Sequence, residues 1–207
     1  MNLNNQVESQ NTLNMIALHF PQSIKFDDNQ FFDFCQVNRE IRLEKTAQGD
    51  CEIMAPTGWE TGRINVILAA QLYIWAEQDG TGVVSDSSTG FILPNGAIRS
   101  PDVSWVKKSR LAHLTAEQKR RFLPLCPDFV IELKSPSDNL KTLQNKMQEY
   151  IENGASLGWL IDPVTKQVHV FQPNQLMFSL DDSTLLSADD LLKNFELNLQ
   201  KVWDVGF

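Results

Sequence analysis

The sequence predicts one α/β domain in which a mixed β-sheet is flanked by helices. Between about residues 57 and 171, helical and strand patterns alternate in the order helix, three strands, helix, two strands. The 207 residues suffice for one complete hydrophobic core and are too few for two domains of ordinary size. The 42% hydrophobic and 21% charged content is usual for a globular protein.

A polar arm is predicted at residues 1–24, followed by the domain itself at 25–207. The first fourteen residues are rich in Asn and Gln and contain no Lys or Arg. The apolar piece Met15–Leu18 is too short for the core of a signal peptide. The densest apolar run, Val66–Ala70, is far shorter than a membrane span. We therefore expect a cytoplasmic protein that makes no membrane contact.

The domain is expected to begin with a small helix-plus-hairpin extension. Residues Asp28–Asn38 fit a short helix with Phe31, Phe34 and Cys35 on one side. Two strand patterns, Ile41–Lys45 and Cys51–Met54, surround a turn at residues 47–50 and predict a β-hairpin.

A long helix comes next and ends near Gln78. Thr57 and Glu60 match a capping box, in which each side chain satisfies a free backbone amide at the start of a helix. Apolar residues surround most of the circumference of this helix, which predicts burial on more than one side. These residues are Ile64, Val66, Ile67, Leu68, Leu72, Ile74 and Trp75.

Three strand regions follow, at Val83–Leu93, Ile98–Val106 and Phe129–Lys134. Asp102 lies in the second region, and Glu132 and Lys134 lie in the third. Alternate side chains of a strand point to the same face, so Glu132 and Lys134 share a face. If the two strands are neighbours, two carboxylates and one ammonium converge, and such a group can hold Mg²⁺. The simpler alternative is an amphipathic edge strand with solvated charges.

The remaining elements close the sheet. A helix with Ser135 as its cap and Pro136 at its first position is predicted to run to Gly154. Two strands follow, at Leu157–Ile161 and Gln167–Phe171. An acidic C-terminal tail ends the chain, and the amphipathic segment Leu191–Trp203 covers it.

The charge balance limits how the protein can meet nucleic acid. The 18 Lys and Arg residues against 26 Asp and Glu give a net charge of −8, which argues against broad, nonspecific phosphate binding. Six basic residues nevertheless gather directly after the Asp102 strand. They form either a solvated face or a phosphate-binding rim beside the carboxylates. These residues are Lys107, Lys108, Arg110, Lys119, Arg120 and Arg121.

The candidate site also carries a family resemblance. Pro101-Asp102 together with Glu132-Leu133-Lys134 looks like the motif of the PD-(D/E)xK nucleases. Longer stretches across about residues 25–175 resemble one branch of these proteins, the Uma-two family. They are Asp86-Ser-Ser-Thr-Gly-Phe91, Arg99-Ser-Pro-Asp102, the segment Cys126–Asp138, and Gly158-Trp-Leu-Ile-Asp-Pro163.

The resemblance implies a restriction-endonuclease-like three-layer core that hydrolyses DNA with Mg²⁺, for which Mn²⁺ can substitute. Asp102 and Glu132 would then be metal ligands, and Lys134 would be the catalytic lysine. Related nucleases often carry an assisting polar residue and a tyrosine four apart on the following helix, and Lys146 and Tyr150 match this spacing. The alternative is a lysine extended along the apolar stripe beside a half-buried tyrosine.

Relatives also tend to place a glutamate before the central motif. Glu44 in the hairpin is the best match and is a candidate third metal ligand, although it equally fits an exposed strand charge. Glu60 fits a helix cap better than a ligand. The predicted function is a Mg²⁺-dependent endonuclease that acts on DNA as a homodimer. The alternative is a noncatalytic module that retains the fold to bind nucleic acid or protein.

Overall fold

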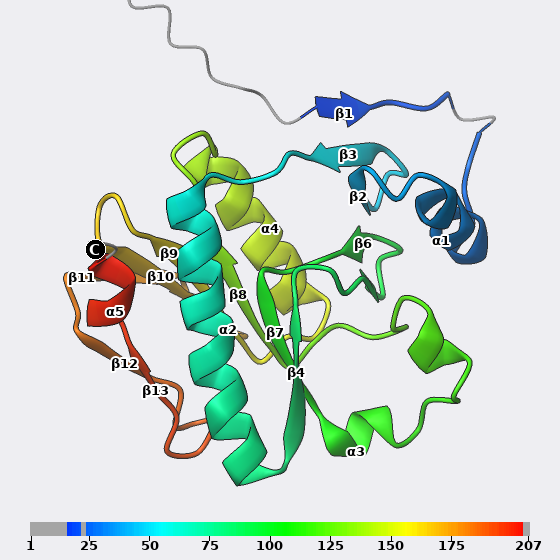
Figure 1. Cartoon of the computed structure of the whole chain (residues 1–207). Coiled ribbons are helices and arrows are strands. Elements are labelled where there is room, and N and C mark those ends of the chain that lie inside the picture. The colour runs from blue at the N-terminus through cyan, green and yellow to red at the C-terminus, as the bar shows by residue number, and fades with distance from the viewer. Residues whose placement is uncertain (1–15, 22–23, 205–207) are drawn as a thin grey trace, which may run out of the picture.

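The computed structural model describes residues 16–21 and 24–204 and is built around a six-stranded mixed sheet (Figure 1). The strand order is β11-β10-β9-β8-β7-β4. Only β8 and β9 run parallel, and the other neighbours in this sheet are antiparallel. The strands are β4 (Gly82–Asp86), β7 (Val103–Lys107), β8 (Phe129–Leu133), β9 (Leu157–Asp162), β10 (Gln167–Phe171) and β11 (Phe178–Asp181).

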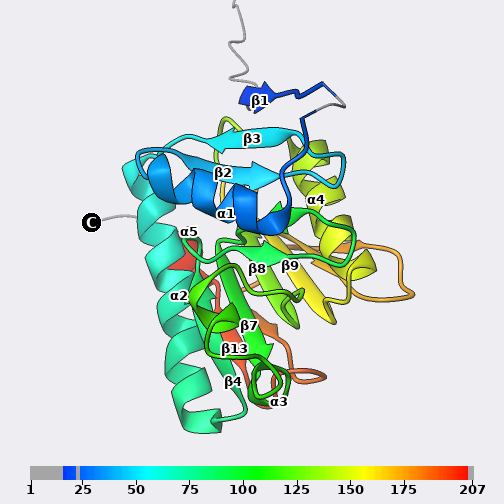
Figure 2. The same cartoon turned by 90° about the vertical axis from the view of Figure 1, so that its right-hand side faces the viewer.

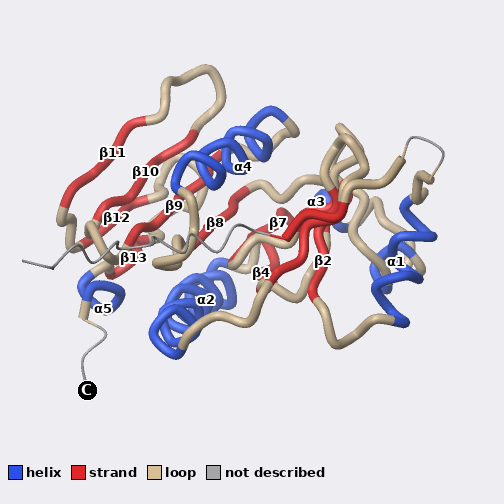
Figure 3. Tube along the Cα trace, turned by 90° about the horizontal axis from the view of Figure 1, so that it is seen from above, coloured by secondary structure: helices blue, strands red, loops and turns tan. Residues whose placement is uncertain are grey.

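Helices cover both faces of this sheet, which gives three layers (Figure 3). Helix α4 (Leu140–Glu152) lies on one face and supplies the crossover that the parallel pair β8–β9 requires. The other face carries α2 (Trp59–Asp79), α5 (Gln200–Trp203) and the hairpin of β12 (Leu185–Ser187) and β13 (Glu196–Asn198). The predicted α/β class, with a mixed sheet between helices, is confirmed.

The alternation of side chains along β8 decides which layer Glu132 enters. Ile131 and Leu133 belong to the core beneath α2, whereas Val130 belongs to the core beneath α4. Glu132 shares the face of Val130 because side chains two apart on a strand point the same way. The carboxylate therefore enters the layer between the sheet and α4.

The predicted helix and hairpin are present as α1 (Asp28–Val37), β2 and β3, and the hairpin is part of a second, five-stranded sheet (Figure 2). Phe31, Leu43, Cys51 and Ile98 are buried in its own small core. The strand order is β1-β3-β2-β6-β5, with bounds β1 (Ile16–Leu18), β2 (Arg42–Lys45), β3 (Cys51–Met54), β5 (Phe91–Ile92) and β6 (Ile98–Arg99).

The N-terminal arm is described only in part. Its residues 16–18 form β1, which pairs antiparallel with β3 at the edge of the second sheet. The remainder of the predicted arm, apart from residues 19–21 and 24, lies outside the described residues. The division into an arm and one domain stays a prediction.

The prediction of one continuous strand at Ile98–Val106 is wrong. It divides into β6, in the second sheet, and β7, in the central sheet, with Ser100, Pro101 and Asp102 between them. Proline has no amide hydrogen to donate to a strand ladder, so pairing is interrupted at this point. Asp102 therefore stands where the chain passes from one sheet to the other.

Helix α2 differs from the sequence prediction in two ways. Its N-cap is Gly58, without a side-chain hydrogen bond, so Thr57 and Glu60 form no capping box. It also buries a single stripe, Ile64, Leu68, Leu72 and Ala76, spaced four residues apart. Apolar residues on the opposite face are exposed, so the predicted burial on several sides is not found within the described chain.

Two further boundaries shift. Helix α4 begins at Leu140, and its N-cap is Asn139, whose side chain accepts a hydrogen bond from the Thr142 amide at 3.1 Å. The expected cap, Ser135, instead donates its backbone N–H to the Asp138 carboxylate at 2.7 Å, which closes a turn before the helix.

The acidic C-terminal segment packs into the main core. Its buried apolar residues account for this placement, because they complete the layer that α2 begins: Leu192, Phe195, Leu197, Leu199 and Val202. Among residues 16–21 and 24–204, no helix has the length and apolar character needed to cross a membrane.

Gly82→Ala tests the tight contact between β4 and β7. A Cβ at this position would overlap the indole ring of Trp105, which is fixed in the core at 1% exposure. We expect the free energy of unfolding, measured by urea denaturation, to fall by about 2 kcal/mol. The matched variant Gly62→Ala lies in α2, where the nearest atom is 3.8 Å away. It should gain up to about 1 kcal/mol, and equal losses in both variants would contradict the contact.

Candidate active site

Glu132 is the centre of a buried polar cluster beneath α4. Its Oε1 atom accepts a hydrogen bond from the Tyr150 hydroxyl at 3.0 Å and lies 2.9 Å from Lys146 Nζ. Lys146 and Tyr150 reach the same carboxylate because residues four apart lie on one face of a helix. The structure thus brings together three residues that the sequence proposed for one site.

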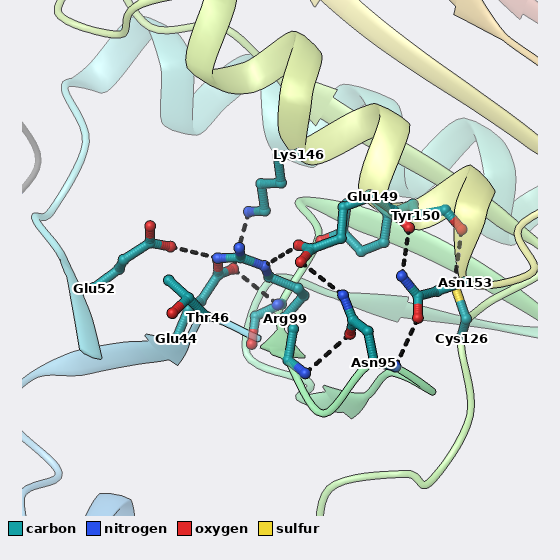
Figure 4. A network of polar contacts seen from close by, with 12 residues as sticks. Glu44, Thr46, Glu52, Asn95, Arg99, Cys126, Lys146, Glu149, Tyr150 and Asn153 are labelled. Carbon is teal, nitrogen blue, oxygen red and sulfur yellow. Dashed lines mark hydrogen bonds and ion pairs between the residues drawn. The ribbon is translucent and has the colours of Figure 1, made fainter. Parts of the chain in front are cut away.

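Glu44 reaches the same lysine from the second sheet (Figure 4). Its Oε1 atom lies 2.9 Å from Lys146 Nζ and accepts a hydrogen bond from the Ser100 amide at 2.8 Å. The side chain is 2% exposed, so Glu44 is not the solvated strand charge of the alternative interpretation. Lys146 therefore bridges Glu44 and Glu132, which come from different sheets.

Arg99, to which the sequence assigned no role, organises the Glu44 side of the cluster (Figure 4). Its guanidinium contacts Glu44 at 3.1 Å, Glu149 at 2.6 Å, and Glu52. Glu44 and Glu52 lie directly opposite each other on β2 and β3, an arrangement that like charges destabilise unless a cation lies between them. The position of Arg99 three residues before Asp102 was the one sequence signal that could have revealed it.

Asp102 is held against the motif strand. Its Oδ2 atom accepts a hydrogen bond at 2.8 Å from the amide of Leu133, the residue between Glu132 and Lys134. The register that pairs Val103 with Ile131 makes β7 and β8 neighbours, as the sequence argument required. Asn65 of α2 approaches the other oxygen at 3.4 Å. Its own buried Oδ1 makes no hydrogen bond to the described chain.

The motif lysine, Lys134, follows β8 and lies beside β9. Its Nζ is 3.4 Å from Asp162 Oδ2, and within the described chain it forms no ion pair with Asp102 or Glu132. Lys146, not Lys134, supplies the ammonium that contacts Glu132. Glu60 is exposed at the start of α2.

Burial and mutual repulsion set the protonation of the carboxylates. Burial raises the pKa of Glu132 to about 7 against the opposing effect of Lys146, and Asp102 and Glu44 add smaller increases. Burial also raises the pKa of Asp102. Burial alone would raise the pKa of Glu44, but Lys146 and Arg99 outweigh it and hold that pKa below its ordinary value. Nearby carboxylates thus outnumber the cations that balance them.

The donor chemistry of this cluster fits a hard divalent cation. Carboxylate oxygens are the ligands that Mg²⁺ prefers, and the ammonium of Lys146 already lies between two of them. In the arrangement described for residues 16–21 and 24–204, no three or more His, Cys, Asp or Glu side chains form a group that could enclose a metal. A surface hollow of about 300 Å³ lies elsewhere, lined by Arg63, Ile67, Gln200, Lys201 and Asp204.

The first part of the basic run lies away from these carboxylates. Lys107 ends β7 at the opposite end from Asp102, and α3 (Lys108–Leu111) follows it there (Figure 1). Arg110 pairs with Asp128 at 3.1 Å, and Lys107 lies 3.9 Å from the same residue. Lys107 and Arg110 are therefore held by Asp128, at a distance from the carboxylates that the interpretation as a phosphate-binding rim required them to border.

The second half of the basic run contains the 3₁₀ helix η1 (Gln118–Arg120). Arg121 contacts α1 through Asp33 at 3.5 Å. Arg42, in contrast, is exposed and close enough to lower the pKa of Asp102. It is therefore an exposed cation in the neighbourhood of Asp102.

The three-layer core and the position of the motif residues place the chain in the restriction-endonuclease-like fold class. The structure is similar, with a TM-score of 0.68 and 18% identity, to a crystal structure described as a putative nuclease belonging to DUF820 from Anabaena variabilis ATCC 29413. The match covers 80% of this chain and 92% of that chain. A search of the curated proteins finds no match.

The family follows from a second comparison. The model of the Uma2 family, described as "Putative restriction endonuclease", matches residues 28–200. The chain belongs to the Uma2 family, which confirms the resemblance seen in the sequence. The family and the fold together support a nuclease.

Arg99→Met tests whether the guanidinium holds the cluster together. The substitution leaves three carboxylates without their common cation, and losing one partner of a buried ion pair costs about 3–5 kcal/mol. We expect urea unfolding to show a loss in this range. The matched variant Arg121→Met removes a partly exposed ion pair and should cost under about 1 kcal/mol. A small loss for Arg99→Met would show that the cluster does not depend on it.

Glu132→Gln tests the raised pKa of Glu132. Because the pKa in the folded protein exceeds that in the unfolded chain, the stabilisation from this group is complete below pH 4.5 and is lost by about pH 7. With divalent cations chelated, the wild type should lose about 3 kcal/mol more across this window than the variant, at about 1.4 kcal/mol per pKa unit. The lowered pKa of Glu44 acts below pH 4.5 and does not interfere. If the free energies of unfolding of the two proteins changed equally with pH over this window, the raised pKa of Glu132 would be ruled out.

Proposed function

We propose that this protein is a metal-dependent endonuclease that hydrolyses phosphodiester bonds in DNA. The observation that carries the proposal is the bridge from Lys146 to Glu44 and Glu132, with Asp102 bound to the strand of Glu132. Three acidic side chains from separate parts of the chain thereby share one buried region. Membership of the Uma2 family supports the same chemistry.

Asp102, Glu132 and Glu44 would hold Mg²⁺, or Mn²⁺ in its place. The bound ion would lower the pKa of a water molecule and stabilise charge on the phosphate. Lys146 offers an ammonium that offsets negative charge in the transition state. Lys134, which has the motif position and follows β8 two residues after Glu132, is the second candidate for this duty. Tyr150 orients Glu132 through its hydroxyl.

The substrate would approach from the side of Asp102. Asp102 is half-buried, whereas the side chains of Glu44 and Glu132 are 2% and 6% exposed. Arg42 is the exposed cation on this side, and it offers a contact for the phosphate backbone. We further propose that the protein acts as a cytoplasmic homodimer, an arrangement that would present two sites to two strands.

One observation favours the alternative of a noncatalytic binding module. Lys146 already pairs with both Glu44 and Glu132, so the cluster is balanced in part without a metal. A purely structural lysine would keep these carboxylates from binding a cation. Metal binding therefore separates the two functions directly.

The nuclease proposal is tested by rates of DNA cleavage, measured on plasmid and single-stranded DNA with Mg²⁺ or Mn²⁺. The wild type is compared with four variants: Asp102→Ala, Glu132→Gln, Lys134→Met and Lys146→Met. We expect each variant to cut at least about a hundredfold more slowly, because each loses a metal ligand or a transition-state charge. Asp33→Ala removes an exposed aspartate of α1 and should cut like the wild type. Gel electrophoresis of the products gives the rates.

Calorimetric titration of the same proteins with Mg²⁺ provides the second measurement. The nuclease proposal requires that the wild type bind the ion and that Asp102→Ala and Glu132→Gln weaken binding. If the wild type neither binds the ion nor cuts DNA that Asp102→Ala spares, the noncatalytic alternative holds.

A further inference from the structure

Helix α2 carries a second apolar face that the described chain leaves uncovered. Trp59, Val66, Tyr73 and Ile74 are exposed by 70%, 68%, 54% and 58%. Together with the exposed Ala70, they form what we call the outer stripe of α2. At about 100° per residue, these five positions fall on one side of the helix, opposite the buried stripe that contacts the sheet.

The position of α2 in the fold leaves this stripe accessible. The helix lies on the outside of the molecule, on the face of the sheet opposite α4 (Figures 2 and 3). Large exposed apolar patches on soluble proteins mark interaction sites. Within the described chain, only one side of the apolar surface of α2 is therefore buried, and the other side is exposed.

The arrangement of the stripe identifies its partner. Ala70 is small and central, Val66 and Ile74 lie four residues on either side of it, and Arg63 and Glu77 lie seven residues on either side. In an antiparallel pair of α2 helices crossing at Ala70, Val66 would face Ile74 of the other copy. Arg63, which is half-buried beside the hollow at α5, would turn outward to face Glu77 in the same way. A two-fold interface requires this self-complementarity, because one surface must match itself.

Charge supports the same occupant. Arg63 and Glu77 form no ion pair within residues 16–21 and 24–204. Arg63 is the only basic residue of α2, and Glu77 belongs to its acidic C-terminal end. An antiparallel contact would place opposite charges together at both ends, whereas a parallel contact would oppose like charges.

We propose that the outer stripe of α2 is the homodimer interface, formed by an antiparallel contact with α2 of a second copy of this chain. The stripe faces away from the sheet, whereas Asn65, on the inner side of α2, contacts Asp102. The carboxylate cluster therefore stays outside the interface. This inference deepens the homodimer proposed above by assigning its surface.

Sedimentation velocity of the full chain, without metal or DNA, tests the interface independently of nuclease activity. We expect the measured mass to rise with protein concentration and to approach twice 23.5 kDa at about 0.5 mM. A dimer with a Kd of about 10 µM would be mostly assembled at that concentration. Val66→Glu and Ile74→Glu each bury a charge at the contact and should raise the Kd at least about thirtyfold. The control Leu176→Glu alters a side chain that is 93% exposed outside α2 and should leave the Kd unchanged.

Charge reversal tests the antiparallel register. Glu77→Arg would place like charges together at both ends of the contact and should weaken the dimer about fivefold. Adding Arg63→Glu in the same chain should restore it. Circular dichroism checks that each variant is folded. A wild type that stays monomeric throughout the series, or a dimer that tolerates both Val66→Glu and Ile74→Glu, would overturn the proposal.

Discussion

The contact of Lys146 with both Glu44 and Glu132 is the interaction on which the rest of the site depends. One ammonium, carried by α4, joins a carboxylate of the five-stranded sheet to a carboxylate of the central sheet. Without it, repulsion would separate two acidic groups that are removed from water. The lysine thus fixes the small N-terminal sheet to the core and assembles the acidic cluster at the same time.

The chain meets the electrostatic demands of this cluster by distributing charge over several elements. Arg99 offsets Glu44, Glu52 and Glu149, and the backbone amide of Leu133 stabilises Asp102. A surplus of carboxyl groups over cations remains, and the pKa of Glu132 is raised mainly by burial and to a smaller extent by Asp102 and Glu44. A fold selected only for stability would gain by removing this surplus, because buried ionised groups are costly. Its retention is the physical reason to expect that a cation or a phosphate-cleaving reaction uses it.

Short patterns predicted the central strands and the hairpin of the extension. They also predicted that Glu132 points to the face opposite Ile131 and Leu133. Lys146 and Tyr150 could be found because their spacing on one helix matches the assisting pair of the nucleases that the sequence resembles. Arg99 and the pairing of Lys134 with Asp162 could not, because they depend on how two sheets and a neighbouring parallel strand meet. The break at Pro101 was missed although proline is a known interruption of a strand. Nothing in the local sequence showed that the two halves of that strand would join different sheets.

The apolar circumference of α2 shows how a sequence pattern can be right about chemistry and incomplete about its partner. Hydrophobic periodicity reports that a surface avoids water, and it does not distinguish burial within one chain from burial between two copies. The inner stripe is covered by the sheet, and the outer stripe remains exposed. Its symmetry about Ala70 carries information that a core-facing stripe does not need, because packing against a sheet imposes no two-fold relation on a helix. A self-complementary helix face is therefore better explained by association of two chains than by surplus hydrophobicity.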